Sequence, residues 1–196
     1  MTRVVSLFLP SWSTDRLRRK AGDAAPPVEA PLALIGRDGR RQVVLAVDAA
    51  AQAAGVRVGM PATKARVLVQ GLVVQDHDPA ADAQALDRLA LWLLQRYAPI
   101  VTVDPPSGLV IDSSGVDHLH GGEEAMITGL IDRLAASGVR ARAAIADTWG
   151  AAHALARYGA KPALIAPPGH GSAVLTGLPL AALRLPTDMI ASLHAL

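Results

Sequence analysis

The segment from Asp78 to Tyr97 constrains the fold of this chain more than any other. Asp78 is a suitable N-cap residue, and Pro79 suits the first helical turn because the N–H that it lacks would have no partner there. Apolar residues then recur at intervals of three and four positions, at Ala83, Leu86, Leu89, Ala90, Leu93 and Leu94. This spacing predicts a long amphipathic helix with one face against a core.

A hairpin is predicted directly after this helix. The stretch VTVDPPSGLVIDSSG, residues 101–115, consists of two apolar runs that are typical of strands, joined by a tight turn. The turn contains Pro105, Pro106, Ser107 and Gly108, none of which carries a charge. Proline lacks a backbone donor and restricts the residue before it to extended geometry, so the pair suits a turn.

The other predicted elements alternate along the chain. Short apolar runs predict strands at residues 4–9, 31–35, 42–47, 72–75 and 140–146. Capped or periodic segments predict helices at residues 15–20, 48–54, 62–69, 123–136 and 148–158. Polar connections are expected at residues 36–41 and 161–171, and two short helical pieces broken at Pro186 follow. This order favours an α+β fold of ferredoxin type with an insertion after its first strand.

Composition and charge exclude several classes of protein. The chain has no cysteine, which excludes disulfides and thiolate metal sites. No window approaches the ~20 apolar residues that a membrane span needs. The apolar run from Val4 to Pro10 is too short for a secretory signal, so a cytoplasmic location is expected. The tail carries no closing element, and we expect the chain to be a fragment of a longer protein.

The net charge of +2 is too small to indicate a nucleic-acid partner by itself. The basic residues gather in the first third of the chain, at Arg16, Arg18, Arg19, Lys20, Arg37, Arg40, Arg41, Arg57, Lys64 and Arg66. Such clusters are typical either of a solvated surface or of contacts to phosphate groups, for which the forked guanidinium is well suited.

Three stretches, in this order, resemble the Y-family translesion DNA polymerases. They are VVLAVDAAAQAAGVRVGMPATKA, YAPIVTVDPPSGLVIDSSG and ARAAIADTWGAAHALARYGAKP. They are similar to the family's fingers segment, to its acidic hairpin and to the end of its palm. The resemblance implies a ferredoxin-like palm at residues 1–10 and 73–166, an inserted small fingers subdomain at 11–72, and the truncated start of a helical thumb at 167–196.

The resemblance places the family's metal site on residues that cannot hold a metal. Phosphoryl transfer in the family depends on two Mg²⁺ ions about 4 Å apart, held by carboxylates. The positions of these acids fall on Ser6 and Phe8 in the first strand and on Ser107 and Gly108 in the hairpin turn. None of the four side chains supplies a charged oxygen, so no metal or other cofactor is expected.

The nucleotide contacts of the family are changed as well. Its triphosphate-holding tyrosine and arginine fall on Ala49 and Gln52, its last palm lysine on or near His153, and the aromatic residue beside the sugar on or near Ser11. Loss of metal ligands together with triphosphate donors removes several kcal/mol of transition-state stabilisation. Nucleotidyltransferase activity is therefore predicted to be absent.

The opening stretch RVVSLFLPSWSTDRLRR is similar to one branch in particular, the ImuB-like homologues that lack the catalytic carboxylates. This resemblance implies a DNA-binding and protein-bridging scaffold in damage-induced mutagenesis. The implied partners are DNA through weak phosphate contacts, a RecA-like accessory protein of ImuA type, an error-prone replicative-type polymerase and the sliding clamp, mostly through regions beyond this chain. The candidate DNA contacts are Arg37, Arg40, Arg41, Lys64 and Arg66.

Two other hypotheses stay open from the sequence. Asp104, Asp112 or Asp117 could serve a relocated metal site in an active translesion polymerase; otherwise they are solvated or capping carboxylates. The run from Asp117 to His120 likewise indicates either an exposed loop or a metal site. The second of these hypotheses is a protein-interaction platform that does not touch DNA, and salt-dependent DNA binding would exclude it.

Overall fold

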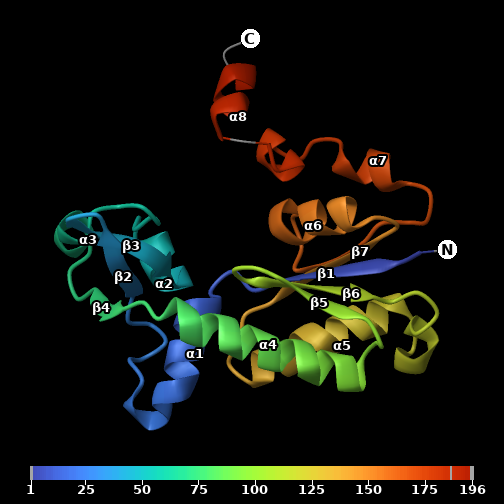
Figure 1. Ribbon diagram of the computed structural model, residues 1–196, viewed down its shortest axis with the longest axis horizontal. Coiled ribbons are helices and arrows are strands. Elements are labelled where there is room, and N and C mark those ends of the chain that lie inside the picture. Colours follow the sequence, from blue (N-terminus) through green and yellow to red (C-terminus); the bar gives the residue numbers. More distant parts are fainter. Residues whose placement is uncertain (1, 186, 195–196) are drawn as a thin grey trace. The chain divides into compact units, whose positions relative to one another are not determined.

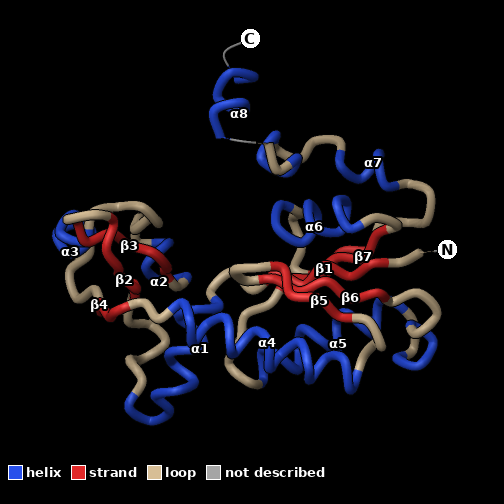
Figure 2. Tube along the Cα trace, viewed as in Figure 1, coloured by secondary structure: helices blue, strands red, loops and turns tan. Residues whose placement is uncertain are grey.

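The computed structural model describes residues 2–185 and 187–194, so the predicted break at Pro186 lies outside the described residues. The chain divides into two compact units. Unit 1 comprises Met1–Pro10, Leu86–Ser137 and Ala141–Leu196. Unit 2 comprises Ser11–Ala85 and Gly138–Arg140. Each unit has a sheet of its own, drawn in red in Figure 2.

Unit 1 is built on a sheet with the strand order β5-β6-β1-β7-β8 in the described part of the chain (Figure 1). Its strands are β1 (Val4–Phe8), β5 (Val101–Asp104), β6 (Gly108–Asp112), β7 (Arg142–Ala146) and β8 (Ala163–Ile165). The central strand β1 pairs antiparallel with both β6 and β7, whereas β8 runs parallel to β7. The first strand of the sequence is thus the middle of the sheet.

Strand alternation gives β1 two distinct faces. Val5 and Leu7 are fully buried, and they pair with Ile111 and Leu109, which are also fully buried. The even-numbered residues Ser6 and Phe8 point to the opposite face, and Phe8 packs against a cluster of alanines from β7 and α6.

Helices cover both faces of this sheet (Figure 1). The helices α4 (Pro79–Arg96) and α5 (Glu123–Ala136) lie on one face, and α6 (Trp149–Tyr158) lies on the other. The helix α6 packs against β1 and β7, so it covers the face that carries Ser6 and Phe8. The remaining helical pieces of unit 1 are η2 (Asp117–His120), α7 (Gly171–Leu175), η3 (Leu180–Leu183) and α8 (Thr187–His194).

Unit 2 contains a smaller sheet in the order β3-β2-β4. Its elements are α1 (Trp12–Ala21), η1 (Gly22–Ala24), β2 (Leu32–Asp38), β3 (Arg41–Val47), α2 (Ala49–Ala53), α3 (Ala62–Leu68) and β4 (Val73–Asp76). The strand β2 pairs antiparallel with β3 and parallel with β4. Its core is made of small aliphatic side chains: Ala33, Ile35, Val44, Ala51, Val56, Ala62, Ala65 and Val69.

The predicted α+β fold is confirmed, and the caps expected at Asp48 and Asp78 are observed, together with a cap at Thr148 that was not predicted. The side chains of Asp48 and Thr148 accept hydrogen bonds from the backbone N–H groups of Ala51 and Ala151. Asp78 accepts from Ala81 N–H in the same way. These local signals fix where α2, α4 and α6 begin. The assignment of the chain to palm, fingers and thumb stays a prediction.

Three predicted elements need correction. The expected connection at residues 161–171 contains the short strand β8, which the flanking prolines concealed; an edge strand tolerates prolines at its ends. The hairpin in unit 2 has a connection of only Gly39 and Arg40, because a glycine at φ 58° allows a tight turn while polar strand ends continue the ladder. The first helix begins at Trp12 and not at Asp15, since Ser11 takes the N-cap position.

No helix within residues 2–185 and 187–194 has both the length and the apolar character that crossing a membrane requires.

Candidate functional site on the sheet of unit 1

The hairpin β5–β6 lies beside β1, and this pairing brings together three of the four positions that the resemblance assigns to metal-binding acids. Phe8 pairs with Gly108, and the N–H of Leu9 donates to the carbonyl oxygen of Ser107 at 2.8 Å. On its other side, Gly108 pairs with Asp104 of β5. Cross-strand partners share a face, so Phe8, Gly108 and Asp104 all point toward α6.

The fourth position, Ser6, lies two residues earlier on the same face of β1. It is fully buried and pairs with Val110 on one side and Ala144 on the other. Its hydroxyl oxygen has no hydrogen-bond partner among the described residues. A buried hydroxyl without a partner costs about 1–3 kcal/mol relative to a satisfied one. Ser6 therefore supplies neither a charge nor a stabilising hydrogen bond.

A cation of the protein itself lies at this site. Arg157, on α6, donates from Nη2 to Asp104 Oδ2 at 3.0 Å. The central carbon of its guanidinium lies 4.7 Å from the centre of the Phe8 ring. A guanidinium over an aromatic face is stabilised by about 0.5–2 kcal/mol. Burial lowers the pKa of Arg157, which the neighbouring carboxylate of Asp104 opposes.

His153, one helical turn before Arg157, completes the cluster. Its Nε2 lies 3.9 Å from Asp104 Oδ2, and Nδ1 is buried without a partner among the described residues. Burial, followed by the positive charge of Arg157, lowers the pKa of His153 below its usual value. The imidazole is consequently neutral at pH 7, and its separation from Asp104 is too long for a hydrogen bond.

The structure places the other candidate metal ligands apart. Asp112 is at the far end of β6 and accepts from the N–H of Ser114 at 2.9 Å. Hydrogen bonding from the side chain of Ser114, and then from its backbone, lowers the pKa of Asp112. His120 stacks on Tyr97 with ring centres 5.0 Å apart. The described residues contain no group of three or more histidine, aspartate or glutamate side chains that could hold a metal. The carboxylate of Asp104 is held by Arg157, so it is not free for a relocated metal site.

The remaining candidate nucleotide contacts belong to unit 2. Ser11 is buried at the start of α1 and accepts from Thr14 Oγ1 through its carbonyl oxygen. Ala49 and Gln52 lie on the short helix α2, where Gln52 is exposed. Neither Ala49 nor Gln52 offers the charged donor that an arginine would, so the expectation that these two positions lack the family's triphosphate contacts stays a prediction.

The candidate DNA contacts are also in unit 2. Arg37, Arg40 and Arg41 occupy the tip of the β2–β3 hairpin, and all three are exposed. Lys64 and Arg66 are exposed on α3. Exposed guanidinium groups on a tight hairpin can reach phosphate oxygens without loss of an internal ion pair.

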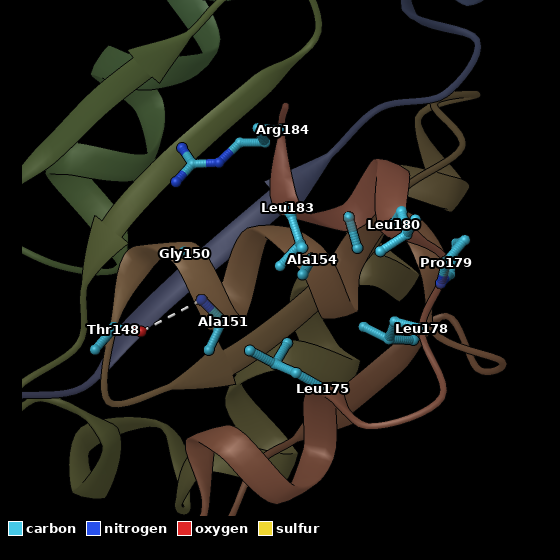
Figure 3. Close-up of a pocket in the computed structure, with 11 residues that line it drawn as sticks. Thr148, Gly150, Ala151, Ala154, Leu175, Leu178, Pro179, Leu180, Leu183 and Arg184 are labelled. Atoms are coloured by element: carbon cyan, nitrogen blue, oxygen red, sulfur yellow. Dashed lines mark hydrogen bonds between the residues drawn. The ribbon is translucent and has the colours of Figure 1, made fainter. Parts of the chain in front are cut away.

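A pocket of about 360 Å³ lies on the outer side of α6 (Figure 3). Four leucines from the segment after β8 line it, namely Leu175, Leu178, Leu180 and Leu183. They face Ala151 and Ala154 of α6. Arg184 stands at its edge, with its guanidinium 4.1 Å from the centre of a ring of Trp149. The pocket is apolar and offers one cation, and it carries none of the candidate residues.

The sequence profile of the impB/mucB/samB family matches residues 25–157, which is more than half of the 196 residues. The chain belongs to the impB/mucB/samB family. Its similarity to curated members is high: it is 54% identical over 131 residues to Protein ImuB of Caulobacter vibrioides strain NA1000 / CB15N and to that of strain ATCC 19089 / CIP 103742 / CB 15. The match covers 67% of this chain and 28% of each relative.

Solved Y-family polymerases share the fold of this impB/mucB/samB family chain. The insertion ternary complex of Dbh DNA polymerase superposes with a TM-score of 0.80 at 15% identity, over 98% of this chain and 57% of the other. DinB from Sulfolobus solfataricus superposes with a TM-score of 0.77 at 14% identity, over the same shares. The fold is therefore that of a Y-family polymerase, and the candidate site lies on its central sheet.

Sequence reasoning about this family member missed Arg157. The spacing of residues on α6 could have indicated it. Trp149, His153 and Arg157 recur at intervals of four and therefore share a helix face. The prediction considered only His153, as a replacement for a lysine. Strand pairing decides that this helix face meets Asp104 and Phe8, and that pairing is not visible in the sequence.

Proposed function

We propose that this chain is a catalytically inactive, polymerase-like subunit of an error-prone translesion synthesis complex, which binds DNA weakly and bridges other proteins. The observation that carries the proposal is the chemistry of the degenerate site. Ser6, Phe8, Ser107 and Gly108 stand at the four positions that the resemblance assigns to metal-binding acids. The charge that lies against two of them is the cation of Arg157.

Metal-assisted phosphoryl transfer needs anionic ligands that hold two divalent cations next to the triphosphate. At this site the one nearby carboxylate, Asp104, is paired with Arg157 at 3.0 Å. A guanidinium in that position repels a divalent cation, and each lost metal contact removes several kcal/mol of transition-state stabilisation. These charges support a function without nucleotidyl transfer.

The DNA-binding part of the proposal rests on unit 2. Three exposed arginines stand together at the hairpin tip, and Lys64 and Arg66 add two exposed cations on α3. The proposed protein partners are those that the ImuB-like resemblance implies: a RecA-like accessory protein of ImuA type, an error-prone replicative-type polymerase and the sliding clamp. The match spans 28% of the length of the curated relatives, and the partners of the whole protein are part of this proposal.

Primer extension tests the absence of catalysis. With primed DNA, nucleotides and either Mg²⁺ or Mn²⁺, the chain should extend no primer above the background of a protein-free reaction. Extension that disappears in the Asp112→Asn or Asp104→Asn variant would contradict the proposal, because it would identify an active polymerase with a relocated metal site. An active Y-family polymerase at the same protein concentration serves as the positive control.

Salt-dependent binding to primed DNA tests the DNA contacts. Each phosphate contact contributes about 0.9 to the slope of log K against log salt concentration. Replacing Arg37, Arg40 and Arg41 together by alanine should reduce that slope. The matched control replaces the exposed Arg88, Arg96 and Arg133 of α4 and α5, which removes the same charge and should leave the slope unchanged. Binding that does not depend on salt would instead favour a platform that contacts only proteins.

A further inference from the structure

The position of Arg157 has a consequence beyond the missing acids. Its guanidinium lies in front of Phe8 and Gly108, on the face of the sheet that α6 covers. The contacts are a hydrogen bond of 3.0 Å to Asp104 Oδ2 and a stacking distance of 4.7 Å to the Phe8 ring. The side chain is largely withdrawn from solvent, with 15% of its surface exposed, and Asp104 is similar at 18%.

Gly108 lies against this ion pair and against the backbone of Asp104. A Cβ atom at this position would lie 3.0 Å from Arg157 Nη2, 3.1 Å from Asp104 Oδ2 and 3.0 Å from the carbonyl oxygen of Asp104. Its φ angle lies outside the left-handed range that favours glycine, so the conformation itself would allow other residues. The tight contacts therefore come from the surrounding atoms, and a side chain at position 108 requires that Arg157 and Asp104 give way by a few tenths of an ångström.

The charges of the ion pair itself balance without an added ion. Arg157 contributes one positive charge and Asp104 one negative charge, while a lowered pKa keeps His153 neutral at pH 7. A buried charge is retained only when it is paired, so the two residues depend on each other. A divalent cation entering here would meet a paired carboxylate and a fixed like charge.

We propose that Arg157 is the resident cation of the degenerate site and closes it to divalent metal ions. Restoring a carboxylate would then not recreate a metal site, because the new acid would pair with Arg157. This inference deepens the proposed function and rests on it for the assignment of Phe8 and Gly108 to former acid positions. It adds that the loss of metal binding has two causes: missing acids and a side chain that fills the space they faced.

The test compares Mn²⁺ binding in two variants of the 196-residue chain. Phe8→Asp places a carboxylate opposite Asp104 across Gly108, and Phe8→Asp/Arg157→Ala has the same carboxylate without the guanidinium. Mn²⁺ affinity is measured by the loss of the free-ion signal in electron paramagnetic resonance. We expect the double variant to bind Mn²⁺ about tenfold or more tightly than the single variant, since the nearest like charge is gone.

A matched control separates this local effect from net charge. Phe8→Asp/Arg133→Ala removes one exposed positive charge from α5, and it should bind Mn²⁺ as weakly as Phe8→Asp alone. Equal Mn²⁺ affinity with and without Arg157 would overturn the proposal, whether both variants bind or neither does. That result would leave the primer-extension result of the unaltered chain unchanged, so the two proposals fail separately.

A second measurement uses variants with smaller changes to the fold. Gly108→Ala, Arg157→Ala and their combination are compared by chemical unfolding, with circular dichroism as the signal. If Arg157 fills the space in front of Gly108, the alanine at position 108 should cost less stability when Arg157 is absent. Additive losses would show that Gly108 is required for another reason, and they would overturn the proposal independently of Mn²⁺.

Discussion

Ser6 shows how a single residue can be neutral for function and unfavourable for stability. An acid at position 6 would face α6, together with any metal that it bound. Ser6 faces the same helix, and its hydroxyl finds no partner among the described residues. Ser113 provides the contrast, because its equally buried hydroxyl donates to the carbonyl oxygen of Arg3 at 3.0 Å. The two serines differ in whether the fold supplies an acceptor.

The Ser6→Ala substitution should leave stability unchanged or raise it by about 0.5–1 kcal/mol, since it removes an unsatisfied buried hydroxyl. Ser113→Ala should lower stability by about 1 kcal/mol, because it removes a satisfied one. Both values are measured by urea unfolding of the two variants beside the unaltered chain. A loss for Ser6→Ala as large as that for Ser113→Ala would mean that Ser6 has a partner, such as an internal water.

The helix α1 shows how an element changes the meaning of its residues. Its basic cluster was interpreted as a solvated surface or a phosphate site, but two of its arginines make internal contacts. Arg18 donates to Asp48 Oδ2 at 2.6 Å and to three backbone carbonyl oxygens, and Arg16 pairs with Asp82. These residues therefore hold unit 2 together. The phosphate-binding hypothesis for unit 2 rests on the hairpin tip and α3.

Asp15, on the same helix, should make stability depend on pH. Burial raises its pKa to about 6 from 3.8, although its carboxylate accepts from Arg140 N–H at 2.8 Å. The folded state binds this proton more tightly than the unfolded state. The contribution of the protonated Asp15 carboxyl to stability is therefore fully present below about pH 4 and is lost as the pH rises through 6.

Asp15→Asn keeps the acceptor for Arg140 and removes the charge, so it should stabilise the chain by about 1–2 kcal/mol near pH 8. The full difference in pKa would correspond to about 3 kcal/mol, which partial solvent exposure reduces. The gain should disappear near pH 4, and urea unfolding at several pH values measures it. Asp87→Asn on the exposed side of α4 is the control. A pH-independent effect of Asp15→Asn would contradict the prediction.

Across unit 1 as a whole, Arg3 joins parts of the chain that are distant in sequence. Its guanidinium donates to both carboxylate oxygens of Glu123, at 2.5 and 2.8 Å, and to Asp147 Oδ1 at 2.7 Å. It also donates to the carbonyl oxygen of Ala166 at 2.9 Å. These contacts tie the start of β1 to α5, to the loop before α6 and to the end of β8. They raise the pKa of Arg3 above its usual value.

Arg3→Met should destabilise the chain, because it leaves the carboxylates of Glu123 and Asp147 without their cation. The stability of Arg3→Lys should lie between that of Arg3→Met and that of the unaltered chain. An ammonium keeps the charge but cannot donate to both oxygens of Glu123 in the fork geometry of a guanidinium. Chemical unfolding measures both, with the exposed Arg133→Met as control. A loss for Arg3→Met no greater than that for Arg133→Met would show that the ion pairs contribute no net stability.

Local physics made much of the fold predictable from the sequence. Capping residues, apolar periodicity and turn residues act within a few positions of one another, and they placed α4, α5 and the β5–β6 hairpin closely. The strand β8 was not predicted, because the apolar pattern of its three residues, Ala163–Ile165, is too short to outweigh the prolines around them. Its existence depends on the long-range pairing with β7.

The sequence by itself determined that Ser6, Phe8, Ser107 and Gly108 carry no acid, and the resemblance predicts that these are the acid positions of the family. It did not determine what faces them. Only the tertiary structure decided that the guanidinium of Arg157 lies against Phe8 and Asp104, on a helix that comes some fifty residues later in the chain. The physical reason is that charge pairing depends on distance in space, and strand register and helix packing set that distance.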